Sequence, residues 1–199
     1  MRNVRPFAAG LVALPLLLSA AVFQTACKSP SIAEVQASLQ VVDVQTKWVA
    51  KDYKQWPQPK LVLVPLVQFR VKNTSSQPLL YVNFNAIFKK PGDPENLGDN
   101  FLAAIRDEPI PPGGFSPVIT LKSNFGREGR NLAQFKKLPQ ELTYNVKIFA
   151  QFGGSRHALL GEYPVSKDID FKEDEAVHMD GKTVVKTDKT EPGRPETKR

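Results

Sequence analysis

Apolar and polar residues alternate along several short stretches of the chain, and this pattern constrains the fold more than any other feature. In residues 42–51, one face would carry the apolar set and the other face charged and amide side chains. The apolar set is Val42, Val44, Thr46, Trp48 and Ala50. Side chains of a strand point to alternate faces, so this period of two predicts a strand with one buried face.

The same kind of pattern predicts seven strands in all. Residues 67–72 and 80–88 repeat the alternation, and four further segments are rich in apolar residues. These four are residues 101–106, 115–122, 143–152 and 158–165. Runs of glycine, proline, asparagine and serine separate the segments, as at residues 73–78 and 109–114. Residues 127–137 are the one stretch expected to form a short helix.

About seven short strands with polar turns predict an all-β fold, an antiparallel immunoglobulin-like β-sandwich at residues 38–171. The chain has a single cysteine, Cys27, so the inter-sheet disulfide of true immunoglobulin domains is excluded and apolar packing must hold the sheets together. Residues 172–199 are highly charged and poor in apolar side chains. We expect a disordered tail there, because the segment buries too little surface to offset its ordering entropy.

The first 26 residues have the layout of a secretory signal peptide. Arg2 and Arg5 supply the basic start, a run of 22 uncharged residues ends at Cys27, and small residues precede that cysteine. A retained transmembrane helix is the alternative, since about 20 apolar residues span a bilayer. A proline and several small residues reduce the apolar content of this run, so we expect a cleaved signal at residues 1–26.

Cys27 follows the apolar stretch directly. Residues 24–27 read QTAC and resemble the lipobox of bacterial lipoproteins, although Gln24 stands where that pattern has an aliphatic residue. The resemblance implies that Cys27 is acylated and becomes the mature N-terminus, with residues 27–37 as a short polar tether. It also implies that Lys28, in place of an aspartate, directs the protein to the outer membrane.

A second cleavage site stays open. Residues 19–21 read SAA and suit ordinary signal peptidase, which would release a soluble protein that starts at Val22. Exported proteins usually pair their cysteines, so a lone thiol needs an explanation. Acylation of Cys27 supplies one, and an incidental free cysteine is the alternative.

Residues 65–88 and 110–121 carry a second resemblance, which extends over residues 60–165. They read PLVQFRVKNTSSQPLLYVNFNAIF and IPPGGFSPVITL. Both are similar to strand and turn segments of the bacterial immunoglobulin-like domains called FxLYD and of the related late-embryogenesis-abundant type 2 fold. A fainter similarity is to the YcfL outer-membrane lipoproteins. These resemblances imply a β-sandwich, and they supply no catalytic residues.

The sequence lacks the patterns that mark common catalytic and metal sites. No HExxH, CxxC or GxSxG motif occurs, and no glycine-rich phosphate loop follows a strand. We expect His157 and His178 to be solvated, and the acidic residues of segment 168–175 lack the spacing of an EF-hand loop. We therefore expect no metal, no cofactor and no enzymatic activity. A hydrolase assembled around His157 from scattered residues is the alternative.

The chain is mildly basic, with 27 basic and 20 acidic residues and a net charge of +7. The basic residues are scattered singly or in pairs rather than gathered among aromatic residues, so nucleic-acid binding is not expected. A weak attraction to anionic headgroups or envelope polymers is compatible with this charge.

Four residues are candidates for contact with a ligand or partner. Tyr53 and Trp56 are expected in a loop that continues with two prolines, where their rings would be accessible. Arg127 and Arg130 lie in a glycine-containing loop at residues 124–130 and suit an anionic group.

Together these features predict a non-catalytic lipoprotein of the bacterial cell envelope, held by acylated Cys27 at the periplasmic face of the outer membrane. Its partners would be the membrane itself and an envelope protein or polymer. The alternative is a ligand-binding lipoprotein that captures an envelope glycan, peptide or lipid fragment.

Overall fold

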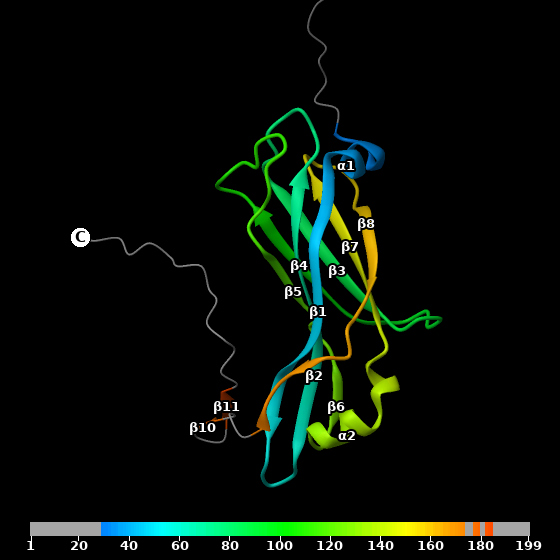
Figure 1. The fold of residues 1–199 in the computed structure, drawn as a ribbon, viewed down its shortest axis with the longest axis vertical. Coiled ribbons are helices and arrows are strands. Elements are labelled where there is room, and N and C mark those ends of the chain that lie inside the picture. Colours follow the sequence, from blue (N-terminus) through cyan, green and yellow to red (C-terminus); the bar gives the residue numbers. More distant parts are fainter. Residues whose placement is uncertain (1–28, 174–176, 180–181, 185–199) are drawn as a thin grey trace, which may run out of the picture.

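The computed structural model describes residues 29–173, 177–179 and 182–184, and it shows two β-sheets packed face to face (Figure 1). The first sheet contains β1 (Leu39–Lys54), β2 (Lys60–Asn73), β5 (Ile119–Lys122), β6 (Arg127–Gly129) and β9 (Ile169–Asp170). Their order is β5-β2-β1-β9, and β6 also pairs with β2. The second sheet contains β3 (Val82–Lys89), β4 (Asn96–Ile105), β7 (Asn145–Phe152) and β8 (Ala158–Pro164). Their order is β4-β3-β7-β8.

Neighbouring strands in both sheets run antiparallel, except that the two-residue β9 runs parallel to β1. This arrangement confirms the predicted antiparallel immunoglobulin-like β-sandwich. All seven predicted strands are present in these two sheets, and β6 and β9 are additional members of the first sheet. β4 begins earlier than predicted, at Asn96, and β5 later, at Ile119. The late start of β5 fits Pro117, which has no N–H to donate to a strand ladder.

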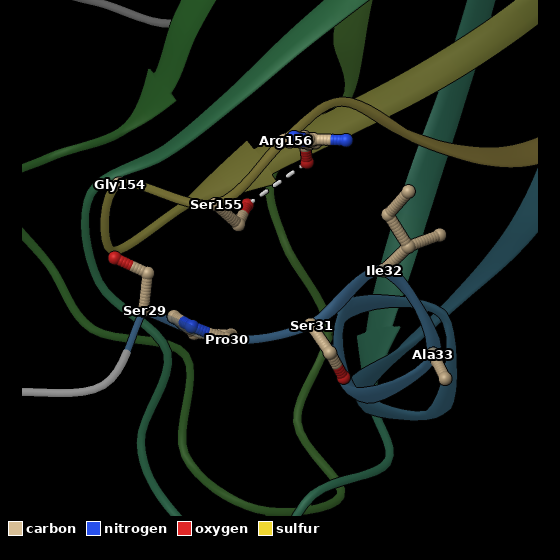
Figure 2. Close-up of a pocket in the computed structure, with 8 residues that line it drawn as sticks. All are labelled: Ser29, Pro30, Ser31, Ile32, Ala33, Gly154, Ser155 and Arg156. Atoms are coloured by element: carbon tan, nitrogen blue, oxygen red, sulfur yellow. Dashed lines mark hydrogen bonds between the residues drawn. The ribbon is translucent and has the colours of Figure 1, made fainter.

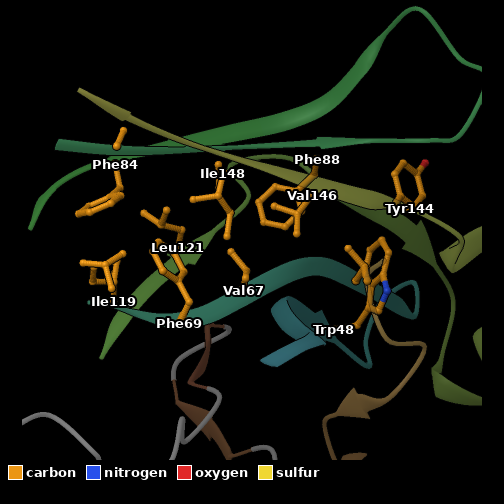
Figure 3. Packing of buried hydrophobic residues seen from close by; sticks show 14 of the residues in the cluster. Trp48, Val67, Phe69, Phe84, Phe88, Ile119, Leu121, Tyr144, Val146 and Ile148 are labelled. Carbon is orange, nitrogen blue, oxygen red and sulfur yellow. The ribbon is translucent and has the colours of Figure 1, made fainter. Parts of the chain in front are cut away.

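The core lies between the two sheets, where side chains of both layers interdigitate (Figure 3). The first sheet contributes Trp48, Val67, Phe69, Ile119 and Leu121, and the second contributes Phe84, Phe88, Val146 and Ile148. The rings of Phe69 and Phe84 meet edge to face across the layers, with centroids 5.6 Å apart. Burying each large apolar side chain contributes about 1.5–3 kcal/mol, so this packing holds the sheets together without a disulfide.

β1 carries two bulges that change which of its side chains face the core. Its register on β2 shifts after Val42, around Asp43 with a φ of 54°, and again at Lys51. An extra residue in one strand reverses the alternation beyond it. Val41 and Val44 therefore pack against the core, and the prediction that Val42 faces it is wrong.

The segment before β1 is folded over most of its length. α1 (Ile32–Ser38) begins after Ser31, whose hydroxyl accepts a hydrogen bond from the N–H of Glu34 and whose N–H donates to the Glu34 carboxylate. Val35 of this helix is fully buried in the main core. The predicted tether at residues 27–37 is therefore too long, because an amphipathic turn of that segment packs on the sandwich.

The short helix expected at residues 127–137 is only half present. The first part of this segment is β6, and α2 (Leu132–Lys137) forms the second part. The side chain of Asn131 caps α2 by accepting a hydrogen bond from the N–H of Gln134 at 3.0 Å. A short 3-10 helix, η1 (Pro139–Leu142), then leads to β7.

Part of the C-terminal segment has regular structure. β10 (Val177–Met179) and β11 (Lys182–Val184) pair as antiparallel strands, and β11 lies near β1. The tail predicted to be disordered, residues 172–199, thus contains a short strand pair, and most of its other residues lie outside the described part of the chain. The predicted signal peptide at residues 1–26 and Cys27 also lie outside it.

The sandwich is elongated, and its two ends differ. α1 and the start of the described chain lie at one end, which we call the α1 end (Figure 1). The long β1–β2 hairpin runs to the other end, where β6 and α2 accompany it (Figure 1). The entry of the chain and the loop of this hairpin are therefore separated by the length of the domain.

Candidate functional site

The loop that joins β1 to β2 presents the most exposed of the large apolar side chains that the structure describes. Residues 55–59 read QWPQP, and Trp56 is 85% exposed. The indole of Trp56 therefore contributes almost nothing to the packing of the core. Tryptophan is enriched among the side chains that carry protein–protein binding energy, because the ring combines a large apolar area with an N–H donor.

Two lysines close this loop as a cross-strand pair. Lys54 is directly opposite Lys60 in the ladder between β1 and β2. Lys60 forms an ion pair with Glu128 at 2.8 Å, and the hydrogen bond and charge of Glu128 raise the pKa of Lys60. Lys54 forms no ion pair within the described residues, so it adds an uncompensated positive charge beside Trp56.

Three further cations lie at the same end of the sandwich. Gly129 of β6 pairs with Leu61 of β2, so Arg130 follows beside the hairpin loop, and α2 brings Lys136 and Lys137 to this end (Figure 1). All three cations are exposed, and none has an ion-pair partner among the described residues. We call residues 54–60 together with Arg130, Lys136 and Lys137 the distal tip.

Tyr53 does not belong to this surface. It is the penultimate residue of β1 rather than part of a loop, and it is only 4% exposed. Its ring packs edge to face on Phe171, and its hydroxyl accepts a hydrogen bond from Nε2 of Gln55 at 2.8 Å. The prediction of an accessible Tyr53 is wrong because the bulge at Lys51 turns this side chain toward the core.

Arg127 is engaged within the domain. Its guanidinium forms an ion pair with the carboxylate of Glu141, which connects β6 to η1. It also lies beside Tyr144, where burial raises the pKa of the phenol and the charge of Arg127 acts in the opposite direction. The structure therefore brings Trp56 and Arg130 to one end of the sandwich. Tyr53 packs on Phe171 and Arg127 pairs with Glu141, so neither is available at that surface.

The cations of α2 at the distal tip were not identified from the sequence. Lys54 and Lys136 are more than eighty residues apart, and each resembles an ordinary solvated lysine in its own segment. Only the return of the chain through β6 and α2 beside the hairpin brings these charges together. The one local signal was Trp56 itself, an indole in a polar, proline-rich loop.

An open cleft of about 560 Å³ lies at the α1 end, between the start of α1 and the turn that joins β7 to β8 (Figure 2). Ser31 uses its hydroxyl to cap α1. The hydroxyl of Ser155 donates to the carbonyl oxygen of Arg156 at 3.1 Å and accepts from the N–H of Phe152 at 3.2 Å. Among the residues that the structure describes, no carboxylate or imidazole lines this cleft, so none of these residues could act as a base toward its serines.

The ionisable groups singled out in the sequence are dispersed. His157 is exposed beside the β7–β8 turn, and the side chain of His178 lies outside the described set. Asp170 forms an ion pair with Lys47 at 2.6 Å, and Asp168 accepts a hydrogen bond from the hydroxyl of Ser166. Among the described residues no three histidine, cysteine or acidic side chains are grouped to hold a metal ion.

The described chain enters the domain at the α1 end. Ser29 and Pro30 lie against the turn formed by Gly153 and Gly154 (Figure 2). No helix within the described ranges is long and apolar enough to cross a bilayer. Cys27 precedes these residues by two positions.

Comparison with known protein families gives no match, and comparison with curated proteins gives none either. Among solved structures, the chain is similar to the ligand-binding region of serine-glutamate repeat protein A (SgrA) of Enterococcus faecium, with 11% sequence identity. The match covers 59% of this chain and 89% of that chain, with a TM-score of 0.25. A similarity at this level carries no functional argument.

Proposed function

We propose that this protein is a non-catalytic lipoprotein of the bacterial cell envelope, anchored by acyl chains on Cys27 and acting through contacts of its distal tip. The observation that carries the proposal is the position of the two ends. The chain enters the sandwich at the α1 end, and Trp56 with its neighbouring cations lies at the opposite end (Figure 1). An anchored domain of this shape presents the distal tip away from its own membrane.

The anchor would hold the α1 end close to the bilayer. At about 3.5 Å per residue, the chain from Cys27 to Ser31 spans no more than about 14 Å. Each buried acyl methylene contributes about 0.8 kcal/mol, and stable anchoring takes more than one chain. Two or three acyl chains on Cys27 would therefore keep the domain at the surface, and Lys28 supports the periplasmic face of the outer membrane as the location.

The distal tip supports an anionic partner. Trp56 offers a rigid apolar surface, and Lys54, Arg130, Lys136 and Lys137 lie at the same end of the sandwich, where none of them forms an ion pair with a described carboxylate. This chemistry suits an envelope protein or polymer that presents acidic groups beside an apolar or sugar surface. Capture of a small ligand in the cleft at the α1 end has weaker support, because the cleft is open and its serine hydroxyls at positions 31 and 155 already serve the fold.

Site-specific photocrosslinking in the native envelope tests the role of the distal tip. A photoreactive residue at position 56 is expected to capture one discrete partner, and the capture should fall when Lys54 and Arg130 are both changed to glutamine. The same photoreactive residue at position 159 is the control, because Leu159 is exposed on β8, away from the tip. Equal capture at both positions, or none at position 56, would contradict the proposal.

A further inference from the structure

A second group of cations lies on the outer face of the first sheet, around the ring of Phe115. The guanidinium carbon of Arg70 is 5.0 Å from the centroid of this ring, and Nζ of Lys72 is 5.7 Å from it. Phe115 is itself 48% exposed. Two cations thus share one half-exposed aromatic ring, an arrangement that concentrates positive charge on an apolar surface.

The positive charge of this group is poorly compensated. The Nε of Arg70 donates to the carbonyl oxygen of Ser116 at 3.0 Å, which holds the guanidinium beside the ring. Its nearest carboxylate partner is Asp43 at 3.7 Å, an exposed and solvent-screened pair. Lys72 has no ion-pair partner among the described residues. An anion that approaches Phe115 would therefore meet Lys72, which has no ion pair, and Arg70, whose carboxylate partner is exposed.

This group lies near the α1 end of the sandwich. Phe115 bridges to Lys72, one residue before the end of β2. The next two residues tie that end of β2 to its neighbours: the N–H of Asn73 donates to the carbonyl oxygen of Gly114, and the N–H of Thr74 donates to that of Ser38 at the end of α1. The group is therefore near the end through which the chain leads to Cys27.

We propose that Arg70, Lys72 and Phe115 form a binding site for the phosphate groups of anionic phospholipids, which we call the headgroup site. It goes beyond the proposed function, on which it rests only for the orientation of the α1 end toward a membrane. The apolar components favour a lipid surface over a soluble anion. Val118, three residues along the chain from Phe115, is 61% exposed, and exposed apolar side chains of this kind insert at the boundary between headgroups and acyl chains.

The acyl tether would let the headgroup site bind lipid even if its own affinity is low. Electrostatic attraction is screened beyond about 8 Å at physiological salt, so cations on a freely diffusing domain rarely sample a headgroup. A tether of at most about 14 Å, less than two screening lengths, keeps the α1 end close enough to the headgroups for repeated contact. The headgroup site would then fix the tilt of the domain and direct the distal tip away from the bilayer.

Vesicle binding by residues 28–199 tests the headgroup site without the anchor. This segment contains the whole described core, which extends from Val35 to Phe171. Partition is measured by sedimentation with vesicles of phosphatidylglycerol and phosphatidylethanolamine, and with vesicles of neutral phosphatidylcholine. We expect binding to the anionic vesicles alone, and we expect it to be lost in high salt, which shortens the screening length.

Substitutions at the headgroup site give the decisive comparison. Each cation near an anionic surface accounts for about a five-fold change, so Lys72→Gln should lower the partition about five-fold and Arg70→Gln with Lys72→Gln about twenty-five-fold. Phe115→Ser should lower it further with an unchanged melting temperature. The matched control is Lys90→Gln with Lys167→Gln, two exposed lysines outside both the headgroup site and the distal tip, which removes the same charge and should leave the partition within two-fold, about the scatter of such data.

Three results would overturn the headgroup site. The first is equal partition to neutral and anionic vesicles, and the second is an equal loss for the control pair. The third is competition by inorganic phosphate at millimolar concentration, which would assign the cations to a free anion. Because Cys27 is absent from the tested segment, failure of this assay leaves the acyl anchor intact. Conversely, an unmodified Cys27 in cells leaves the vesicle result unaffected.

Discussion

The ring of Tyr53 packs edge to face on the ring of Phe171, with centroids 5.1 Å apart and an interplanar angle of 67°. Tyr53 lies near the end of β1 and Phe171 directly follows β9, so this contact attaches the end of the described sandwich to the long hairpin. The backbone reinforces it nearby, where the N–H of Trp48 donates to the carbonyl oxygen of Asp168 at 2.8 Å. Residues 168–171 thus stabilise β1, the first strand of the hairpin that carries the distal tip.

Phe171→Ala is expected to lower the free energy of unfolding by about 3 kcal/mol, because truncating a buried aromatic ring leaves a cavity. Urea denaturation of residues 28–199 measures this. Phe125→Ala is the matched control: Phe125 is 67% exposed, and its loss should change stability by no more than about 0.5 kcal/mol. Equal effects of the two substitutions would show that Phe171 does not brace the hairpin.

Asn73→Ala should destabilise the domain by about 2–3 kcal/mol, because it leaves buried partners without hydrogen bonds. Asn73 is fully buried; its Nδ2 donates to the carbonyl oxygens of Gln77 and Ile110, and its Oδ1 accepts from the N–H and hydroxyl of Ser75. Asn145→Ala, which removes an exposed hydrogen bond to Glu162, is the comparison and should cost about 0.5 kcal/mol. Thermal melts that fail to separate the two variants would contradict this account.

Gly126→Ala is expected to cost about 3 kcal/mol and to loosen β6. A Cβ at Gly126 would lie 2.0 Å from the carbonyl oxygen of Leu63, so the backbone of β6 would have to move off β2. Amide hydrogen exchange should accelerate in β6 and in the facing residues of β2. Gly161→Ala is the comparison and should cost less, because the three atoms nearest to its Cβ belong to the far end of the Tyr163 side chain and not to the backbone. Unchanged exchange in β6 would refute the prediction.

Alkaline pH should weaken the fold through two tyrosines. Burial raises the pKa of both Tyr144 and Tyr163 above the ordinary value of 10.0. Above pH 10 the unfolded chain therefore binds fewer protons than the folded one, and the free energy of unfolding falls as pH rises. In a pH titration, the absorbance of the phenolate should appear at a higher pH in the folded protein than in the protein unfolded by urea. Changing both residues to phenylalanine should make the free energy of unfolding fall less steeply with pH above pH 10. An unchanged slope of the free energy of unfolding against pH would contradict this assignment.

The period of two in the sequence was enough to predict the sandwich, because buried faces such as that of Val67, Phe69 and Val71 are encoded within one strand. The bulges of β1 were not predictable in this way. Nothing in the residues around Asp43 or Lys51 marks an extra residue, which becomes visible only when β1 is aligned on β2. The error at Tyr53 follows from the second bulge.

β6 and the two clusters of cations depend on contacts between distant parts of the chain. Residues 127–129 pair with β2 because Gly126 lets the chain approach Leu63, and no local pattern encodes that approach. Phe115 and Arg70 are separated by more than forty residues. Exposure of Trp56, by contrast, was predictable from its own polar loop.

The central claim, that Cys27 anchors the domain, is tested most directly by intact mass spectrometry of the protein purified from its native membrane. The account predicts a mature chain that begins at Cys27 and carries the mass of its acyl chains. A chain that begins at Val22 with an unmodified thiol at Cys27 would contradict it.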